Sequence, residues 1–396
     1  TVDIFLIALA SPIVAATAYL VGLSLLSGRR RAPDSGPPEL RFAVVVPAHD
    51  EAAGIAATVK SLRALDYPPS LYRIVVVADN CKDDTAERAR AAGAEVLVRE
   101  DPVRRGKGYA LAHGFERVLR GSEIDAVVVV DADTVVSPNL LRAFAARLDA
   151  GASAIQSDYV VRNPAASWRT LLMTIALATV NTLRSLARER LSVSVGLKGN
   201  GMCFTASLLR AVPHDAFSIV EDLEYGIRLG ELGHRVHFAG EAQVSGEMPT
   251  GEQSSRTQRN RWEEGRTQMI QLHALRLLLE GLRRPSRICL DLALDLLVPP
   301  LATLLALTTT GLVASLAISL ATGQLLTATW LWLGCALGLC LYALRGFQLS
   351  GTGVRGLLAL AHVPAYVVWK LALLVRRPAQ PSGAWVRTAR EKQETL

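Results

Sequence analysis

The chain has 396 residues, of which 50% are hydrophobic and 20% charged, and its formal net charge is +7. This length is enough for two or three domains, and the mixture of apolar and charged segments indicates a water-exposed part joined to membrane spans. The basic residues cluster beside apolar runs, as in cytosolic flanks of membrane helices, without the aromatic interleaving of a nucleic-acid-binding stripe. Nucleic acid is therefore not an expected partner. The five cysteines have no metal-ligand spacing and predict no disulfide framework.

Residues 4–26 are uncharged and apolar, which is long enough to span a hydrocarbon core of roughly 30 Å. A cleaved signal peptide would begin with a basic region, whereas here the basic run at residues 29–31 follows the segment. The positive-inside rule therefore places the chain from residue 29 onward in the cytosol. Residues 32–39, rich in Pro, Gly and Ser, predict a linker.

Strands alternate with helices through the next hundred residues. Because such alternation is typical of a doubly wound parallel sheet, we expect the strand ends to share one edge, where a nucleotide would bind. The predicted strands are residues 42–47, 73–78, 95–98 and the valine-rich run from 126, and the predicted helices are about 53–65, 85–92 and 108–119.

Two carboxylates, Asp131 and Asp133, follow the valine-rich strand. Hard oxygen ligands of this kind suit Mg²⁺ or Mn²⁺, and such ions commonly hold substrate phosphates. The structural alternative is that both aspartates cap the helix expected after Pro138, although Ser137 is placed to cap that helix alone. A lone Asp-x-Asp does not decide between these interpretations.

Other polar residues follow the neighbouring strands. Asp50 or Glu51, together with Asp79, can accept hydrogen bonds from a base and from ribose hydroxyls. Arg105 and Lys107 stand among glycines, where they can approach and neutralise phosphate. The Walker pattern and the Gly-x-Gly-x-x-Gly pattern are both absent, which disfavours a P-loop or a dinucleotide site.

The second half begins with a predicted strand at residues 154–157. Residues 167–191 are too polar to span, and predict either an interfacial helix or a core helix. The run Lys198-Gly-Asn-Gly-Met202 gives a flexible backbone that an acceptor could approach closely.

Glu221 and Asp222 open a helix predicted to reach about residue 232. Acidic residues there are ordinary dipole partners, and the functional alternative is a general base facing a sugar. Gln258, Arg261 and Trp262 share one helical face, so they could stack on a sugar and bind a diphosphate; alternatively, Trp262 is an interfacial anchor. Residues 269–282 predict an amphipathic helix on the membrane surface.

Residues 298–320 and 325–344 predict two further spans. A third apolar run, 357–375, is broken by His362, Pro364 and Lys370. If it crossed, the basic tail would lie outside, against the positive-inside rule, so we expect a re-entrant or interfacial segment and a cytosolic tail. An additional pass at residues 289–300 would have to bury Asp291 and Asp295.

Taken together, the motifs resemble those of membrane-bound family 2 glycosyltransferases, the group of cellulose, hyaluronan and poly-N-acetylglucosamine synthases and of ceramide glucosyltransferases. The resemblance covers roughly residues 41–265. The matching pieces are Pro47 to Glu51, Asp79, Arg105 to Lys107, Asp131-Ala-Asp133, Gly199-Asn200-Gly201, Glu221-Asp222 and Gln258-Arg-Asn-Arg261-Trp262.

This resemblance implies a GT-A cytosolic domain, of the nucleotide-diphospho-sugar transferase α/β fold, with transmembrane and interfacial helices. It implies a metal-dependent, inverting hexosyltransferase that uses a nucleotide-sugar donor, and UDP-sugars are the donors that dominate the resembling group. Asp131 and Asp133 would bracket the diphosphate, with Asp133 as the direct ligand of Mg²⁺ or Mn²⁺. Asp79 would contact the base, and Asp222, beside Glu221, would be the catalytic base. By the same resemblance, three side chains would close over the diphosphate and the acceptor sugar: those of Gln258, Arg261 and Trp262.

Two departures from the motifs of this family leave the identity of the acceptor open. Asn200 stands where Thr is commoner, and Val220 replaces the Thr of cellulose synthases. Polysaccharide synthesis is one expectation. Transfer of one sugar to a lipid, such as a ceramide-like, hopanoid or polyprenyl acceptor, is the alternative, because the predicted spans are few for a polymer channel. A non-catalytic transporter or scaffold is a further alternative. It would lack the catalytic carboxylates, and these are present in the sequence.

The expected organisation is an N-terminal transmembrane helix (1–28), a glycosyltransferase domain (40–250), interfacial helices (251–297) and a C-terminal membrane region with a basic tail (298–396). We expect an integral protein of a bacterial inner membrane, with its catalytic domain cytosolic. Its expected partners are the donor, a glycan or lipid acceptor and membrane lipids, and a homo-oligomer or a channel partner is left open.

Overall fold

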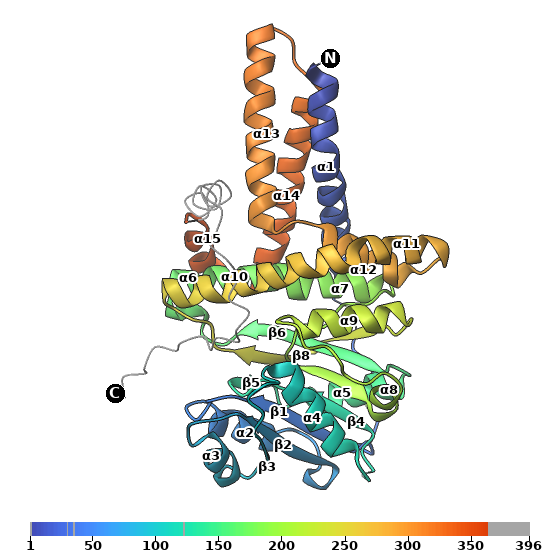
Figure 1. Ribbon diagram of the computed structural model, residues 1–396. Coiled ribbons are helices and arrows are strands. Elements are labelled where there is room, and N and C mark those ends of the chain that lie inside the picture. The colour runs from blue at the N-terminus through green and yellow to red at the C-terminus, as the bar shows by residue number, and fades with distance from the viewer. Residues whose placement is uncertain (1, 30, 35, 122, 363–396) are drawn as a thin grey trace.

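The computed structural model describes residues 2–29, 31–34, 36–121 and 123–362. The expected third apolar run and the basic tail lie largely outside these residues. Three parts are evident in Figure 1: a sheet domain, a layer of helices lying across its top, and a bundle of upright helices.

The sheet has eight strands in the order β3-β2-β1-β4-β7-β6-β8-β5. The first four, β1 to β4, are parallel, as predicted. Beyond β4 the sheet becomes mixed, because β7 runs antiparallel to both β4 and β6, and β5 runs antiparallel to β8. The strands are β1 (Phe42–Ala48), β2 (Tyr72–Asp79), β3 (Glu95–Arg99), β4 (Ala126–Val129), β5 (Thr134–Val136), β6 (Ala154–Val161), β7 (Met202–Thr205) and β8 (Val236–Gly246).

Helices cover both faces of this sheet, because successive side chains of a strand point to opposite faces. Val44 and Val46 of β1 pack in one apolar cluster with α2, α3 and α5, and Val45 packs in a second cluster with α4, α8 and α9. These helices are α2 (Ile55–Arg63), α3 (Thr85–Ala91), α4 (Lys107–Leu119), α5 (Leu140–Asp149), α8 (Ala206–Ala211) and α9 (Glu221–Glu231).

The helix after Pro138 begins at Leu140, two residues later than expected, and its N-cap Asn139 makes no side-chain capping bond. Ser137 therefore does not cap it; the Ser137 hydroxyl instead donates to Asn139 Oδ1 at 2.7 Å. Asp131 and Asp133 do not cap it either, since β5 lies between them and the helix.

The helices of the transverse layer lie between the sheet and the upright bundle (Figure 1). Residues 168–190 form one of them, interrupted by a π-helical segment. The stretch was expected to be too polar to span, but it is 23 residues long and apolar enough to cross a membrane, so that expectation was wrong. It nevertheless lies across the base of the bundle, with 56% of its most apolar window buried. The layer consists of α6 (Trp168–Leu177), η3 (Ala178–Leu183), α7 (Arg184–Arg190), α10 (Glu252–Met269), η4 (Ile270–Ala274), α11 (Leu275–Arg283) and α12 (Arg287–Leu297).

The upright helices are α1 (Val2–Leu26), α13 (Leu301–Thr322) and α14 (Thr327–Ser350), and each is long and apolar enough to cross a membrane. Side chains fill the space between them, with Leu20, Leu304, Trp332 and Leu339 in one buried cluster. Asp3, at the start of α1, accepts hydrogen bonds from the Thr327 and Ala328 amides at 3.1 and 2.9 Å. The short helix α15 (Gly353–Leu360) follows α14.

Candidate active site

The end of β4 places Asp131 at the edge of the sheet. Val127 to Val130 are fully buried, so the strand is held on both faces and its end is fixed in position. The Asp131 amide donates to Asn200 Oδ1 at 3.1 Å, which ties the carboxylate strand to the loop that precedes β7. Asp133 follows after one residue and is partly exposed, with Oδ1 3.5 Å from Thr134 Oγ1.

Lys107 joins three segments that are far apart in the sequence. It begins α4, directly after Gly106, whose φ of 136° is one that L side chains rarely adopt. The Lys107 Nζ lies 2.6 Å from Asp131 Oδ1 and 3.5 Å from Glu221 Oε1, and it donates to the Gly199 carbonyl at 2.6 Å. Burial opposes the charged ammonium, but Asp131 and Glu221 more than offset it, so the pKa of Lys107 lies above its ordinary value.

Glu221 and Asp222 occupy the first turn of α9 and face the same point. Asp222 lies against Gly199: a Cβ built on Gly199 would be 3.1 Å from Asp222 Oδ2 and 3.4 Å from Lys107 Nζ. Only glycine allows this approach at a φ of +77°. Burial raises the pKa of both carboxyls, and Lys107 opposes the rise. Proton-accepting groups with raised pKa values suit general-base chemistry near neutral pH.

The Gly199-Asn200-Gly201 loop is built into the same edge. The Asn200 side chain is fully buried and donates to Thr134 Oγ1 at 2.7 Å, in addition to accepting from Asp131. Gly201 has a φ of +68°, and a Cβ there would lie 2.0 Å from Ser157 Oγ. Asn200 therefore links the end of β4 to the start of β5, beside Asp131 and Asp133.

The neighbouring strand ends hold a second polar group. Asp79, at the end of β2, is 1% exposed and accepts from Arg99 Nη1 at 2.5 Å. Asp50, with a φ of 54°, accepts from the Lys82 amide at 2.6 Å, and the His49 Nδ1 lies 2.7 Å from the Asp79 carbonyl.

The other predicted residues of this edge lie at different depths. Pro47 pairs in register with Val77 inside the sheet. The amide of Glu51 donates to Thr85 Oγ1 at 2.8 Å. Arg105 is exposed and makes no hydrogen bond or ion pair with the described residues. Arg99 was not identified from the sequence, although its place at the end of β3 would have put it on this edge.

The helix α10 carries Gln258, Arg261 and Trp262, which are partly buried. Gly265, one turn further, packs on Val220, immediately before Glu221, and a Cβ there would lie 2.5 Å from Val220 Cγ1. The helix therefore crosses the start of α9. Among the residues that the structure describes, these three side chains make no hydrogen bond or ion pair, and Gln258 Oε1 is buried without a partner.

Arg266 anchors this helix to the layer. Its guanidinium donates to the carbonyls of Asp295, Leu296 and Val298, the last two at 3.3 and 3.2 Å, at the end of α12. These carbonyls have no intrahelical partner where a helix ends. The contact sets the position of α10 relative to α12, and no pattern in the sequence points to it.

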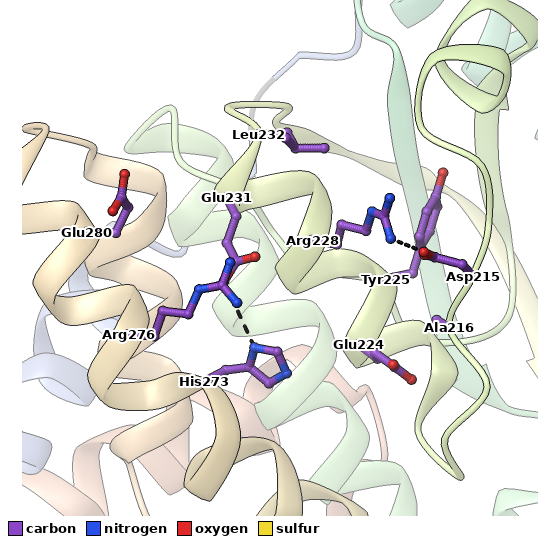
Figure 2. Close-up of a pocket in the computed structure, with 10 residues that line it drawn as sticks. All are labelled: Asp215, Ala216, Glu224, Tyr225, Arg228, Glu231, Leu232, His273, Arg276 and Glu280. Carbon is purple, nitrogen blue, oxygen red and sulfur yellow. Dashed lines mark hydrogen bonds and ion pairs between the residues drawn. The ribbon is translucent and has the colours of Figure 1, made fainter.

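A separate cavity of about 580 Å³ lies on the flank of α9, towards η4 and α11 (Figure 2). Its charges pair with one another: Glu231 Oε1 is 3.2 Å from Arg276 Nε and 3.9 Å from His273 Nδ1, and Arg228 pairs with Asp215. None of the predicted site residues lines it. We therefore take the carboxylate cluster at the strand ends, and not this cavity, as the candidate site.

The cluster suits a divalent cation. Asp131, Asp133, Glu221 and Asp222 bring four carboxylates to one region, where Lys107 pairs with Asp131 and with Glu221. Burial, followed by the charges of Asp133 and Asp131, raises the pKa of Tyr159. Hard oxygen ligands of this kind fit Mg²⁺ or Mn²⁺. Another group of possible ligands, Asp50, Cys81 and Asp83, has its ligand atoms within 4.8 Å of one another.

A half-parallel sheet with acidic residues at its strand ends, covered by helices on both faces, defines the GT-A-like class of folds. The fold is similar to that of the mannosyltransferase PcManGT from Pyrobaculum calidifontis, solved with GDP-Man and Mn²⁺, at a TM-score of 0.50 and 19% identity over 86% of this chain and 99% of that one. A sequence model described as "Glycosyltransferase like family 2" matches residues 37–265. The chain therefore belongs to glycosyltransferase family 2.

Two curated relatives cover comparable stretches. The probable glycosyltransferase YdaM of Bacillus subtilis is 25% identical over 58% of this chain and 56% of its own length. The beta-monoglucosyldiacylglycerol synthase of Synechocystis is 28% identical over 62% of this chain and 54% of its own. The chain thus spans about half the length of the curated relatives that it matches.

Proposed function

We propose that this protein is a membrane-bound, inverting glycosyltransferase that moves a hexose from a nucleotide-diphospho-sugar to an acceptor hydroxyl. One observation carries the proposal: Lys107 holds Asp131 and Glu221 at one point, and Asp222 lies beside them across Gly199. The Lys107 ammonium, the metal-binding type of carboxylate at Asp131 and the carboxylate of raised pKa at Asp222 are therefore close enough to contact the same bound sugar nucleotide.

In the proposed mechanism, Asp222 accepts the proton of the acceptor hydroxyl while the hydroxyl oxygen attacks the anomeric carbon. The bond from that carbon to the diphosphate oxygen breaks, and the diphosphate leaves with the electron pair. General-base assistance contributes about 10²–10⁴-fold. Lys107 stabilises negative charge beside the leaving group, and electrostatic stabilisation of this kind is usually the larger contribution. Mg²⁺ or Mn²⁺, held by Asp133 and Asp131, would supply further charge neutralisation at the diphosphate.

The other site residues take their proposed roles from their positions. Asp79, Asp50 and Glu51 end or follow neighbouring parallel strands, where they would receive the nucleoside. Gln258, Arg261 and Trp262 lie on the helix that crosses the start of α9, and they would close over the donor. The catalytic domain would be cytosolic, since α1 ends on the side of the sheet domain and the basic run at residues 29–31 follows it in the sequence.

We favour a lipid acceptor over a growing polysaccharide. The described part of the bundle has buried apolar side chains between α1, α13 and α14, among them Leu20, Trp332 and Leu339, which is unlike the polar lining that a polysaccharide would need. The helices of the layer bring the candidate site to the base of this bundle, where a lipid headgroup would arrive laterally. The Synechocystis relative is named as a synthase of a glycolipid. The Gln-x-x-Arg-Trp motif on α10 supports polysaccharide synthesis as the second candidate.

A donor screen tests the proposal. The purified protein, in nanodiscs of bacterial lipid, would be given UDP- and GDP-sugars with Mg²⁺ or Mn²⁺, and nucleoside diphosphate release would be measured. Mass analysis of the product then separates a discrete glycolipid from a polymer ladder. We expect release with at least one donor and a single glycolipid. No release with any donor, under conditions in which the protein stays folded, would refute the proposed function.

A further inference from the structure

Two aromatic rings join the segment that carries the proposed ammonium to the segment that carries the proposed base. Tyr109 lies on α4, two residues after Lys107. Phe217 lies in the loop before α9, four residues ahead of Glu221. The two rings are stacked, with their centroids 4.1 Å apart and an angle of 8° between their planes. Phe217 is 42% exposed, so its ring reaches solvent and contacts α4 from outside the apolar core.

The backbone of this loop also lies directly on α4. A Cβ built on Gly108 would be only 2.1 Å from the Ala216 carbonyl oxygen, so only glycine allows the two segments to approach this closely. The Tyr109 ring reaches the residue on the other side of Lys107, because a Cβ built on Gly106 would lie 3.9 Å from Tyr109 Cδ2. The loop and the aromatic stack therefore enclose the segment that holds Lys107.

Polar contacts attach the same loop to α9. The Ser218 amide donates to Glu224 Oε2 at 3.0 Å. Asp215, near the start of the loop, forms an ion pair with Arg228 of α9 (Figure 2). Because the loop is bound to α9 at these points, a shift of the loop would move the first turn of α9 with it.

The first turn of α9 holds the two proposed catalytic carboxylates. Glu221 Oε1 is 3.5 Å from Lys107 Nζ, and Asp222 Oδ2 would be 3.1 Å from a Cβ built on Gly199. The separation between the starts of α4 and α9 therefore decides how closely the ammonium and the base approach one substrate. A misplacement of about 1 Å in such a site can cost about 10²-fold in rate.

We propose that Phe217 is a positioning residue for the proposed base: its stack on Tyr109 holds the start of α9 at the distance from Lys107 that glycosyl transfer requires. This inference rests on the proposed function and adds to it a residue that touches no reacting group. Phe217 carries no charge and takes no proton, so it acts through the placement of Asp222. A stack that served stability alone would leave the turnover of the folded protein unchanged.

The test compares kcat and KM in variants of Phe217, in nanodiscs, with the donor that gives diphosphate release. Phe217→Ala should lower kcat about 10- to 100-fold and change the donor KM less than about 2-fold, because the loss is confined to the transition state. Phe217→Leu keeps apolar bulk without a planar ring, and its kcat should fall nearly as far. Phe217→Tyr should keep at least about half of the wild-type kcat, because a phenol ring stacks equally well. Calorimetric titration with the donor nucleotide gives the folded fraction of each variant.

Tyr109 gives a second measurement of the same contact. Tyr109→Leu combined with Phe217→Leu should lower kcat no more than the larger single loss, because either change removes the one stack. Phe217 remains the primary probe, since Tyr109 also lies 5.9 Å from the guanidinium carbon of Arg99. The matched control is Leu232→Ala, which removes a 55% exposed apolar side chain just beyond the far end of α9 and should change kcat less than about 2-fold.

Unchanged kcat in folded Phe217→Ala and Phe217→Leu would overturn the inference. A rise in donor KM alone, an equal loss in Leu232→Ala, a full loss in Phe217→Tyr or additive losses in the double variant would overturn it as well. Absence of diphosphate release from the wild type with every donor would instead refute the proposed function. The two failures are therefore distinguishable.

Discussion

The ammonium of Lys107 lies 2.6 Å from Asp131 Oδ1, joining the first residue of α4 to the end of β4. Lys107 thus forms an ion pair with Asp131, and the buried strand β4 holds that carboxylate in position. The same ammonium reaches Glu221 at 3.5 Å. The first prediction follows from this sharing of one cation between two acids, of which Asp131 is half-buried and Glu221 buried.

Lys107→Met should lower sugar transfer by about 10²–10³-fold, as expected when a preorganised charge beside a leaving group is removed. Nucleoside diphosphate release under saturating donor measures the effect, and circular dichroism checks the fold. Lys60→Met, exposed on α2, is the control. Unchanged turnover in folded Lys107→Met would exclude Lys107 from the reaction.

Asp222→Asn should abolish transfer while donor binding survives, because the amide occupies the same space but cannot accept the proton. In the wild type, the base form is required, and burial raises the pKa of Asp222. Activity should therefore fall, as the pH is lowered, at a pH above the ordinary aspartate value of about 3.9. The pH profile of kcat/KM, with donor binding followed by calorimetry, measures both effects. Comparable turnover in the variant would contradict the role.

Chelation should stop transfer, and Mg²⁺ or Mn²⁺ should restore it, since Asp131, Asp133, Glu221 and Asp222 bring hard oxygen ligands to one region. Asp133→Asn should raise the metal concentration needed for half-maximal activity more than it changes the melting temperature. Titration of the metal against diphosphate release measures this dependence. Full activity in excess chelator would remove the metal from the proposal.

Gly201→Ala should unfold at a lower temperature than Gly233→Ala, although both glycines have positive φ, +68° and +82°. The left-handed conformation alone costs roughly 1–2 kcal/mol. At Gly201 the added methyl would also meet Ser157 Oγ at 2.0 Å, whereas Gly233 has nothing within 4 Å, so overpacking should add about 1–3 kcal/mol. Thermal unfolding in detergent compares the two, and equal losses would show that the crowding is relieved at little cost.

Arg266→Met should raise the donor KM roughly 10-fold, because α10 loses its charged hydrogen bonds to the end of α12. Arg266 touches no reacting group, so it acts by positioning the helix that carries Arg261 and Trp262. Steady-state kinetics separate KM from kcat. Arg283→Met, exposed at the end of α11, is the control, and an equal effect of both changes would point to general loss of surface charge.

The parallel half of the fold could be predicted from the sequence, because each of its strands carries its own local pattern. Valine runs at β1, β2 and β4 indicate burial on both faces, and the helices between them indicate parallel neighbours. The same rule placed Asp79 and Asp131 at one sheet edge. The antiparallel directions of β7 and of the three-residue strand β5 could not be predicted, since they are decided by strands distant in the sequence: β4 for β7 and β8 for β5.

The contacts within the candidate site were harder to predict from the sequence. Nothing local in the sequence says that Asn200 braces Thr134 or that Lys107 reaches Gly199, because these contacts depend on how loops close in space. The pairing of α7 with α12 had a readable signal: Arg184 and Arg188 are four residues apart, as are Asp291 and Asp295. Matching spacing puts each pair on one helical face, and the structure joins them.

The hydrogen bond from the Gly201 amide to the Val129 carbonyl, at 2.9 Å, joins the loop of residues 199–201, the proposed acceptor site, directly to the strand that carries Asp131. Replacing this loop with that of a relative would therefore also displace the proposed catalytic carboxylates. Redesign of acceptor choice should instead change side chains around the loop.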